Sequence, residues 1–140
     1  NLWTKKMSDC IFCKIINKDI PSEIVYEDED VLAFLDIKPI SQGHTLVVPK
    51  EHYENIFDVP KNVLNNTMNI VKKISKSIKH ISDGVNIGQN NLLAAGQIVN
   101  HIHFHIIPRF DNDGLKSWPR KSYNEGQMRD VSEKIKKNIE

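Results

Sequence analysis

The sequence predicts an α+β fold, in which an antiparallel sheet of about five strands packs with a long central helix and a short N-terminal helix. Three features predict this class. Short apolar or alternating segments have the period of strands, the segment after Pro60 has the period of a helix, and an acidic turn separates the first two strands. A chain of 140 residues is long enough for one domain with its own core. We expect residues 7–140 to form that domain and residues 1–6 to be an extension or an expression remnant.

The first elements are a short helix and three strands. Residues 10–18 are predicted to form the helix, which ends before Pro21. Strands are predicted at residues 23–27, 31–35 and 44–48, the last ended by Pro49. The first two strands flank the turn Glu27-Asp28-Glu29-Asp30, which predicts a hairpin although the turn contains no glycine.

The long helix follows from a change of period. Lysines fill much of the segment between apolar or small residues. These apolar or small residues recur every three or four positions, at Leu64, Thr67, Met68, Val71, Ile74, Ile78 and Ile81. This predicts one amphipathic helix of about twenty residues, ended by Ser82-Asp83-Gly84. Strands are then expected at 85–88 and 100–109, with the helices on one side of the sheet. Residues 131–139 are expected to form a last helix. The sequence of residues 110–127 gives little indication of secondary structure.

The most informative segment is Asn100–Arg109, in which three of the six histidines alternate with apolar residues. In a strand, His101, His103 and His105 share one face, and the intervening apolar residues share the other. Imidazole titrates near neutral pH, so this row can supply a nucleophile, a proton donor and a metal ligand. The alternative is a surface strand with three solvated histidines.

Residues 95–109 resemble the signature of the histidine triad (HIT) family of nucleotide-binding hydrolases and transferases. Residues 10–16, 31–37 and 43–52 resemble further blocks of the family in the family order, and the pattern is most similar to its short Hint-type branch with the metal-binding cysteines retained. The resemblance implies the HIT-like fold and a homodimer in which the two sheets join.

Three histidines carry the chemistry that the resemblance implies. His103 is the nucleophile that attacks the α-phosphorus and forms a covalent nucleotidyl-imidazole, which water then hydrolyses. Its other ring nitrogen should donate to a carbonyl, expected in the main chain near His101. His105 stabilises the phosphate or protonates the leaving group, and His44 orients the triad from behind. The alternative for His44 is a surface histidine in a Gly-His turn.

The resemblance also implies a nucleotide site. Asp36 would bind both ribose hydroxyls, although an Asp that ends a strand is commonly only a turn residue. The purine would lie among apolar residues, part of which we expect to be ordinary core: Ile11, Phe12, Ile15, Ile20, Phe34 and Ile37. The phosphate would contact residues of the following segment: Asn90, Gly96, Gln97 and the backbone N–H of Ile98, with His103 and His105.

Two features depart from the family pattern. Many relatives carry Ser or Thr in place of Ile98, so a hydroxyl that could contact the leaving group is absent here. The loop Asn91-Leu92-Leu93-Ala94 is also more apolar than usual, which suits either packing or a partner surface.

Cys10 and Cys13 indicate a reducing compartment, in which a metal site or a redox pair is expected rather than a structural disulfide. The chain has no second cysteine pair, so the other two ligands must be histidine or acid. The resemblance implies a closed structural zinc site with His52 and His101. The alternative is a pair of buried free thiols beside a surface histidine.

Composition limits the partners. Nineteen basic and eighteen acidic residues give a net charge of +1, which predicts neither a nucleic-acid partner nor a membrane surface. We find no apolar run that could span a bilayer and no signal peptide, and we expect a cytoplasmic protein, with the nucleus as the alternative.

The predicted function is a purine nucleoside 5′-phosphoramidate hydrolase that releases AMP or GMP. Three alternatives remain: a dinucleoside polyphosphate hydrolase, a non-catalytic nucleotide-binding scaffold that uses the Leu92-Leu93 loop or the C-terminal tail, and a metal-handling protein. Asp36, Asn90 and Gln97 argue against the last of these.

Overall fold

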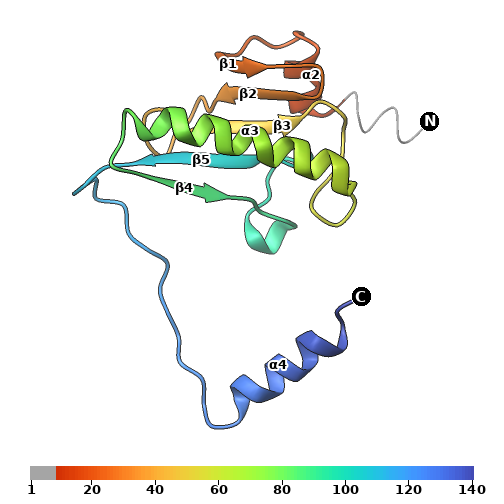
Figure 1. The fold of residues 1–140 in the computed structure, drawn as a ribbon, viewed down its shortest axis with the longest axis vertical. Coiled ribbons are helices and arrows are strands. Elements are labelled where there is room, and N and C mark those ends of the chain that lie inside the picture. The colour runs from red at the N-terminus through yellow and green to blue at the C-terminus, as the bar shows by residue number, and fades with distance from the viewer. Residues whose placement is uncertain (1–8) are drawn as a thin grey trace.

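The computed structural model describes residues 9–140, in which five strands form one antiparallel sheet in the order β1-β2-β3-β5-β4 (Figure 1). The strands are β1 (Ile24–Glu27), β2 (Val31–Leu35), β3 (Thr45–Pro49), β4 (Gly84–Gly88) and β5 (Phe104–Arg109). The helices are α2 (Ile11–Ile16), α3 (Lys61–Lys79), the short 3-10 helix η1 (Leu93–Ala95) and α4 (Gln127–Lys137). The predicted class, sheet and helices are confirmed, whereas η1 was not predicted. The extension predicted at residues 1–6 lies outside the described residues.

The hairpin between β1 and β2 forms without a glycine because Asp28 organises the turn. Its Oδ1 accepts the backbone N–H groups of Asp30 and Val31, each at 2.8 Å. A carboxylate that accepts nearby backbone donors replaces the turn conformation that glycine would otherwise supply. The acidic turn was therefore a sufficient signal for the hairpin.

Helices cover both faces of the sheet, so the expectation that they lie on one side is wrong. Alternate residues of β2 and β3 belong to two separate core clusters. One cluster packs against α3 and contains Val31, Ala33 and Val47, and the other packs against α2 and contains Leu32, Phe34, Leu46 and Val48. Because these two strands are apolar on both faces, each face must be covered by another element.

The long helix α3 buries one side against the sheet, as its period predicts. Its buried positions are Thr67, Ile70, Val71, Ile74 and Ile78, whereas the lysines of the other side are exposed. Past the end of α3, the hydroxyl of Ser82 donates to the carbonyl oxygen of Ile78 over 2.8 Å. Ile81, predicted to continue the apolar side, lies beyond that end and is exposed.

The chain after Leu115 leaves the domain and runs to α4, which stands apart from the sheet (Figure 1). The last helix was predicted at residues 131–139. The structure has it at Gln127–Lys137, so it begins four residues before the predicted start. No residue of α4 is buried. Within residues 9–140, no helix has the length and apolar character needed to cross a membrane.

The core under α3 predicts a specific loss of stability. Ile74 is 8% exposed and lies in the cluster between α3 and the sheet, whereas Ile81 is 66% exposed. Ile74→Ala should lower the free energy of unfolding by about 2–4 kcal/mol, because it leaves a cavity in a close-packed core. The matched control Ile81→Ala should change it by less than about 0.5 kcal/mol. Urea denaturation of both variants measures this, and equal losses would contradict the described packing.

Candidate active site

The histidine segment keeps its predicted alternation, but only part of it belongs to the sheet. Strand β5 begins at Phe104, so His101 and His103 precede the ladder that was predicted over residues 100–109. The neighbouring strand β3 ends at Pro49, which has no N–H to donate, and the N–H of Ile102 donates to the carbonyl of Tyr53 instead. The intervening residues Ile102, Phe104 and Ile106 are nevertheless buried in the cluster under α3.

His103 is held with its proton on a defined nitrogen. Its Nδ1 lies 2.8 Å from the carbonyl oxygen of His101, which is the acceptor expected in this part of the main chain. A carbonyl only accepts, so Nδ1 carries the proton and Nε2 the lone pair. Burial lowers the pKa of His103, so the ring is neutral at neutral pH. A neutral imidazole with a lone pair on Nε2 can act as a nucleophile.

His105 has the opposite tautomer, fixed through His44. The N–H of Ile40 donates to Nδ1 of His44 over 3.1 Å, so the proton of His44 is on Nε2. That Nε2 lies 2.9 Å from Nδ1 of His105, which therefore accepts and keeps its own proton on Nε2. The centroids of the His103 and His105 rings are 4.9 Å apart. Nε2 of His103 thus has a lone pair, and Nε2 of the neighbouring His105 has a proton.

Asp36 supplies a carboxylate beside these rings. Its Oδ2 lies 3.9 Å from Nδ1 of His44, and its Oδ1 accepts the N–H of Lys38 in a turn. Burial lowers the pKa values of His44, His103 and His105, and the charge of Asp36 opposes that effect at all three. The carboxylate is only partly buried, so it is accessible to a ligand.

The four predicted metal ligands form one buried cluster. The ligand atoms of Cys10, Cys13, His52 and His101 all lie within 4.8 Å of one another. Sγ of Cys10 is 3.4 Å from Nδ1 of His101, and the Nδ1 atoms of the two histidines are 3.1 Å apart. These residues come from the start of α2, the segment after β3 and the segment before β5, so the cluster joins three distant parts of the chain.

The protonation of this cluster suits a cation. Nε2 of His101 lies 2.8 Å from the carbonyl of Pro49, which places the proton there and turns the Nδ1 lone pair toward the cysteines. Burial lowers the pKa of His101 to about 4, and burial together with Cys10 raises the pKa of the Cys13 thiol to about 12. A metal ion would displace the protons of the two thiols and bind the Nδ1 atoms of His52 and His101. The donor set therefore fits a metal.

The loop between β4 and β5 is held by the side chain of Gln97. Its amide donates to the carbonyls of Glu54 and Val99, and its oxygen accepts the N–H of Leu92 over 2.8 Å. Asn91 ties the same loop to the N–H of Ile56 over 2.8 Å. The side chain of Gln97 is thus directed at the loop backbone, and its predicted contact with a phosphate stays a prediction.

The remaining predicted nucleotide ligands lie in two places, the loop between β4 and β5 and the apolar residues around α2. The amide Nδ2 of Asn90 lies next to Gly96, which has a φ of +89° that favours glycine. Ile98 is exposed on the same loop. Of the predicted purine slot, Phe12, Ile15 and Phe34 are buried in the cluster under α2, whereas Ile11 and Ile37 are exposed. Part of the slot is therefore core, as expected, and its contact with a base stays a prediction.

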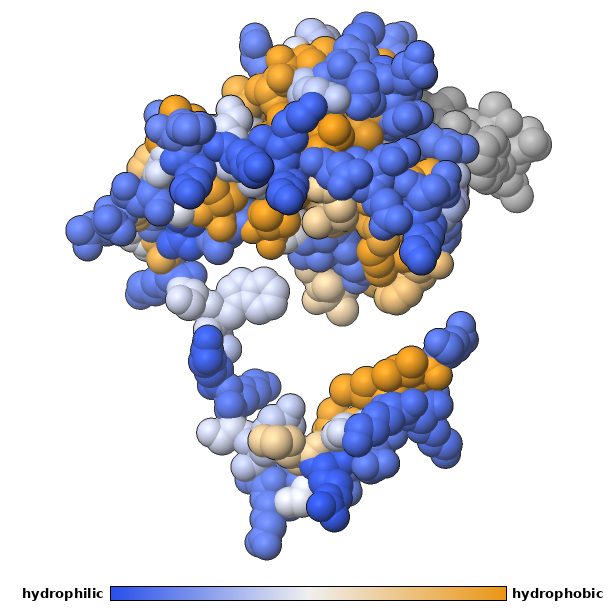
Figure 2. Space-filling view, viewed as in Figure 1, coloured by the Kyte–Doolittle hydropathy of each residue, from blue (hydrophilic) through white to orange (hydrophobic). Residues whose placement is uncertain are grey.

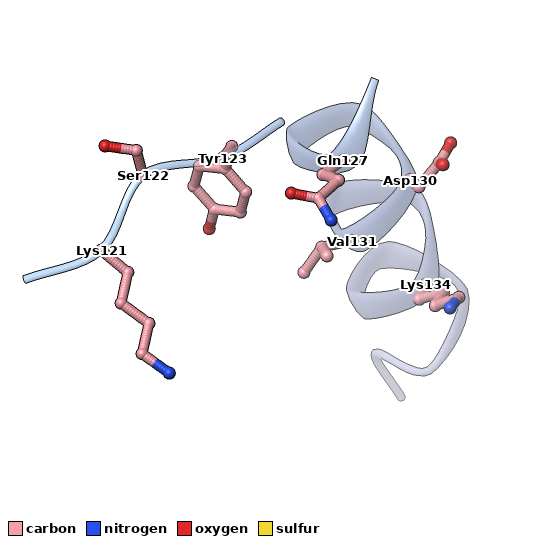
Figure 3. A pocket seen from close by; sticks show the side chains of 7 residues that line it. All are labelled: Lys121, Ser122, Tyr123, Gln127, Asp130, Val131 and Lys134. Carbon is pink, nitrogen blue, oxygen red and sulfur yellow. The ribbon is translucent and has the colours of Figure 1, made fainter. Parts of the chain in front are cut away.

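Sequence reasoning missed the main-chain groups that orient the rings. The carbonyl of Pro49 and the N–H of Ile40 determine two tautomers, and no residue type signals them. It also missed that Phe12 packs edge-on against His103, with ring centroids 5.0 Å apart. A hollow of about 610 Å³ lies in the C-terminal region, between residues 121–123 and α4 (Figure 3). None of the histidines above lines it, so it is not part of this site.

Known proteins are similar to this chain in both fold and sequence. A family model described as "HIT domain" matches residues 17–112. "Adenosine 5'-monophosphoramidase HNT1" of Saccharomyces cerevisiae is 42% identical over 127 residues, which are 84% of this chain and 79% of that protein. A crystal structure of a HIT family member from Bacillus subtilis is 42% identical with a TM-score of 0.86, over 94% of this chain and 98% of its own. A zinc-bound histidine triad family protein from Mycobacterium smegmatis is 34% identical with a TM-score of 0.75, over 95% and 99%.

The cluster predicts metal binding that depends on His52. The purified protein should contain about one metal ion per chain, because four suitable donors converge. His52→Ala should remove most of the metal and lower the melting temperature by about 5 °C or more, since the metal stabilises the folded state. The control His80→Ala changes an exposed histidine at the end of α3 and should retain both. Elemental analysis with thermal unfolding gives the answer, and full metal content in His52→Ala would refute the assignment.

Proposed function

The chain belongs to the histidine triad (HIT) family, and we propose that it hydrolyses purine nucleoside 5′-phosphoramidates, releasing AMP or GMP through a nucleotidyl intermediate on His103. The observation that carries this proposal is the hydrogen bond from Nδ1 of His103 to the carbonyl of His101, which leaves the Nε2 lone pair for attack on phosphorus. The name of the yeast relative, an adenosine 5'-monophosphoramidase, supports the substrate class.

The first step forms a bond from Nε2 of His103 to the α-phosphorus and breaks the bond from phosphorus to the leaving nitrogen. The amine needs a proton to leave. His105 is proposed to supply it from a ring that takes up a second proton when the anionic substrate binds and is left neutral afterwards, because a neutral imidazole that gave up its only N–H proton would become an imidazolate. In the second step a water oxygen bonds to the phosphorus and the phosphorus–Nε2 bond breaks. The nucleoside monophosphate is released, and the proton lost by the water restores His105.

The nucleotide would be held by Asp36, which lies beside these rings, and by the loop between β4 and β5. Asp36 is proposed to accept both ribose hydroxyls, since a carboxylate accepts several hydrogen bonds. The N–H groups of Gly96 and Gln97 donate to the carbonyls of Leu93 and Leu92 inside the loop. We therefore propose the N–H of Ile98 as the backbone donor to the phosphate, and Asn90, whose side-chain amide lies next to Gly96, as a further donor.

The metal is proposed to be zinc with a structural role. A tetrahedral zinc ion with bonds of about 2.0–2.1 Å to nitrogen and about 2.3 Å to sulfur needs donors roughly 3.4–3.8 Å apart. Several of the separations in the cluster are close to this, with Sγ of Cys13 at 3.4 Å from Nδ1 of His52 and 3.6 Å from Nδ1 of His101. Cys10 and Cys13 would thus hold α2 to the triad segment, with no ligand position left for substrate.

The expected assembly is a homodimer. Strand β4 forms the edge of the sheet and pairs with β5 along one side, which leaves its other side for a second sheet. The predicted absence of nucleic-acid and membrane partners, and a cytoplasmic location, stay predictions.

The nucleophile is tested by substitution. His103→Ala should reduce the turnover of adenosine 5′-phosphoramidate at least about a thousand-fold, because no other group replaces the lone pair on Nε2. The wild type quenched during turnover should carry the mass of one AMP residue, absent from His103→Ala, and His80→Ala should retain both properties. Full turnover in His103→Ala would exclude the mechanism. Faster cleavage of a diadenosine polyphosphate would favour the dinucleoside polyphosphate hydrolase, and nucleotide binding without turnover would favour the scaffold.

The acid role of His105 depends on the leaving group. His105→Ala should slow the release of an amine strongly, because an amine leaves only when protonated. It should slow the release of a sulfate from adenylyl sulfate far less, since sulfate leaves as an anion. The ratio of the two kcat/KM values should therefore fall at least about ten-fold relative to wild type. An equal loss for both substrates would assign His105 to phosphate binding alone.

A further inference from the structure

The loop between β4 and β5 begins and ends beside the reactive rings. Gly88, the last residue of β4, pairs with His105 in the sheet. Near the other end of the loop, Val99 packs against the core cluster that contains Phe12, whose ring lies edge-on against His103. A shift of this loop would therefore move groups that adjoin two of the triad histidines.

Leu92, in the middle of this loop, has a backbone conformation that residues with a side chain rarely adopt. Its φ is 73° and its ψ is 162°, a region populated almost only by glycine. Such a conformation persists only where the surroundings hold it. The side chain of Leu92 is 57% exposed, and Figure 2 shows an apolar surface open to solvent at the place of η1, which follows it. Burial of the side chain therefore does not hold this conformation.

Hydrogen bonds to the main chain of Leu92 hold it instead. Its N–H donates to Oε1 of Gln97 over 2.8 Å. Its carbonyl oxygen accepts the N–H groups of Ala95 and Gln97, each over 3.1 Å. Gln97 thus supplies two of these three bonds, which close residues 92–97 into a ring between Asn90 and Ile98.

The side chain of Gln97 is itself anchored outside this ring. It is 3% exposed, and its amide nitrogen donates to the carbonyls of Glu54 and Val99. An amide has two N–H donors, so both are used within the protein and none is left for a phosphate. Tyr53, the neighbour of Glu54, accepts the N–H of Ile102 in the histidine segment over 2.8 Å. The same short segment, residues 53–54, therefore holds both the histidines and the loop.

We propose that Gln97 is a positioning residue, which keeps Leu92 in its strained conformation and thereby fixes the two phosphate donors, the N–H of Ile98 and the side chain of Asn90. This proposal rests on the nucleotide site proposed above, and it replaces direct contact of Gln97 with the phosphate. Without the amide of Gln97, Leu92 relaxes to a conformation usual for leucine and the two donors move apart. A glycine at position 92 adopts the same conformation without strain, so it makes the loop less dependent on Gln97.

The test is a double-mutant cycle in the full chain, with dissociation constants for AMP and adenosine measured by calorimetry. Gln97→Met removes the hydrogen bonds of the amide at nearly constant length. It should weaken AMP binding at least about ten-fold and adenosine binding less than about two-fold, because only AMP carries the phosphate. In the Leu92→Gly background, the loss of AMP affinity caused by Gln97→Met should be at least about five-fold smaller. If Gln97→Met does not fold, Gln97→Asn, whose amide is one carbon shorter, replaces it in the cycle.

The matched control places the glycine one residue later. Leu93 is 85% exposed and lies in η1, where no positive φ is needed. In the Leu93→Gly background, the loss caused by Gln97→Met should therefore be as large as in the wild type. A separate readout needs no nucleotide. The amide proton of Leu92 should exchange slowly with solvent in the wild type and at least about ten-fold faster in Gln97→Met, because its acceptor is removed.

Several results would overturn the proposal. An equal loss of AMP affinity with and without Leu92→Gly would make Gln97 a direct ligand of the phosphate. Equal losses for AMP and adenosine would assign Gln97 to the stability of the whole site, and an unchanged AMP affinity in Gln97→Met would give it no role. A wild type without affinity for AMP would refute the nucleotide site itself. A wild type that shows the predicted coupling but does not hydrolyse a phosphoramidate would refute the proposed reaction and support the role of Gln97.

Discussion

The site depends on the antiparallel register between β3 and β5, which pairs Thr45 with Ile106 and Leu46 with His105. In this register the two ends of β3 orient the two ends of the histidine row. His44, just before β3, bonds to His105, and the carbonyl of Pro49, at the end of β3, accepts the proton of His101. A slip of one residue would turn every side chain to the opposite face and separate these pairs. The core clusters on both faces of β3 hold the strand against such a slip.

One residue couples the metal cluster to the chemistry. The ring of His101 faces Cys10 and Cys13, while its main-chain carbonyl fixes the tautomer of His103. A metal ion held by the cluster would therefore fix the position of the very carbonyl that directs the nucleophile. This is a structural contribution to reactivity, because the metal ligands and the attacking nitrogen belong to different side chains. Burial disfavours the charged imidazolium at His44 and at the three histidines of the triad, and it lowers their pKa values. The rings are therefore neutral, which agrees with the single proton that the hydrogen bonds assign to each ring.

Much of this arrangement follows from local sequence signals. The alternation at residues 101–106 predicts which rings face away from α3, and the period after Pro60 predicts α3 itself. The convergence of Cys10, Cys13, His52 and His101 follows from resemblance to the family, and the structure brings all four together. What the sequence does not reveal depends on main-chain geometry. The acceptor at Pro49, the donor at Ile40 and the start of β5 at Phe104 arise from how distant segments meet, which no residue type encodes. The placement of α2 and α3 on opposite faces follows from the apolar runs in β2 and β3, which are visible in the sequence.

Backbone groups assign opposite tautomers to His103 and His105, and this assignment governs which ring attacks and which ring donates. The most direct measurement is nitrogen NMR of the protein with ¹⁵N-labelled histidine rings, recorded at neutral pH with long-range couplings to the ring protons. We expect His103 to be neutral with its proton on Nδ1, and His105 and His44 to be neutral with their protons on Nε2. A His103 ring that is protonated on both nitrogens, or that carries its proton on Nε2, would contradict this assignment.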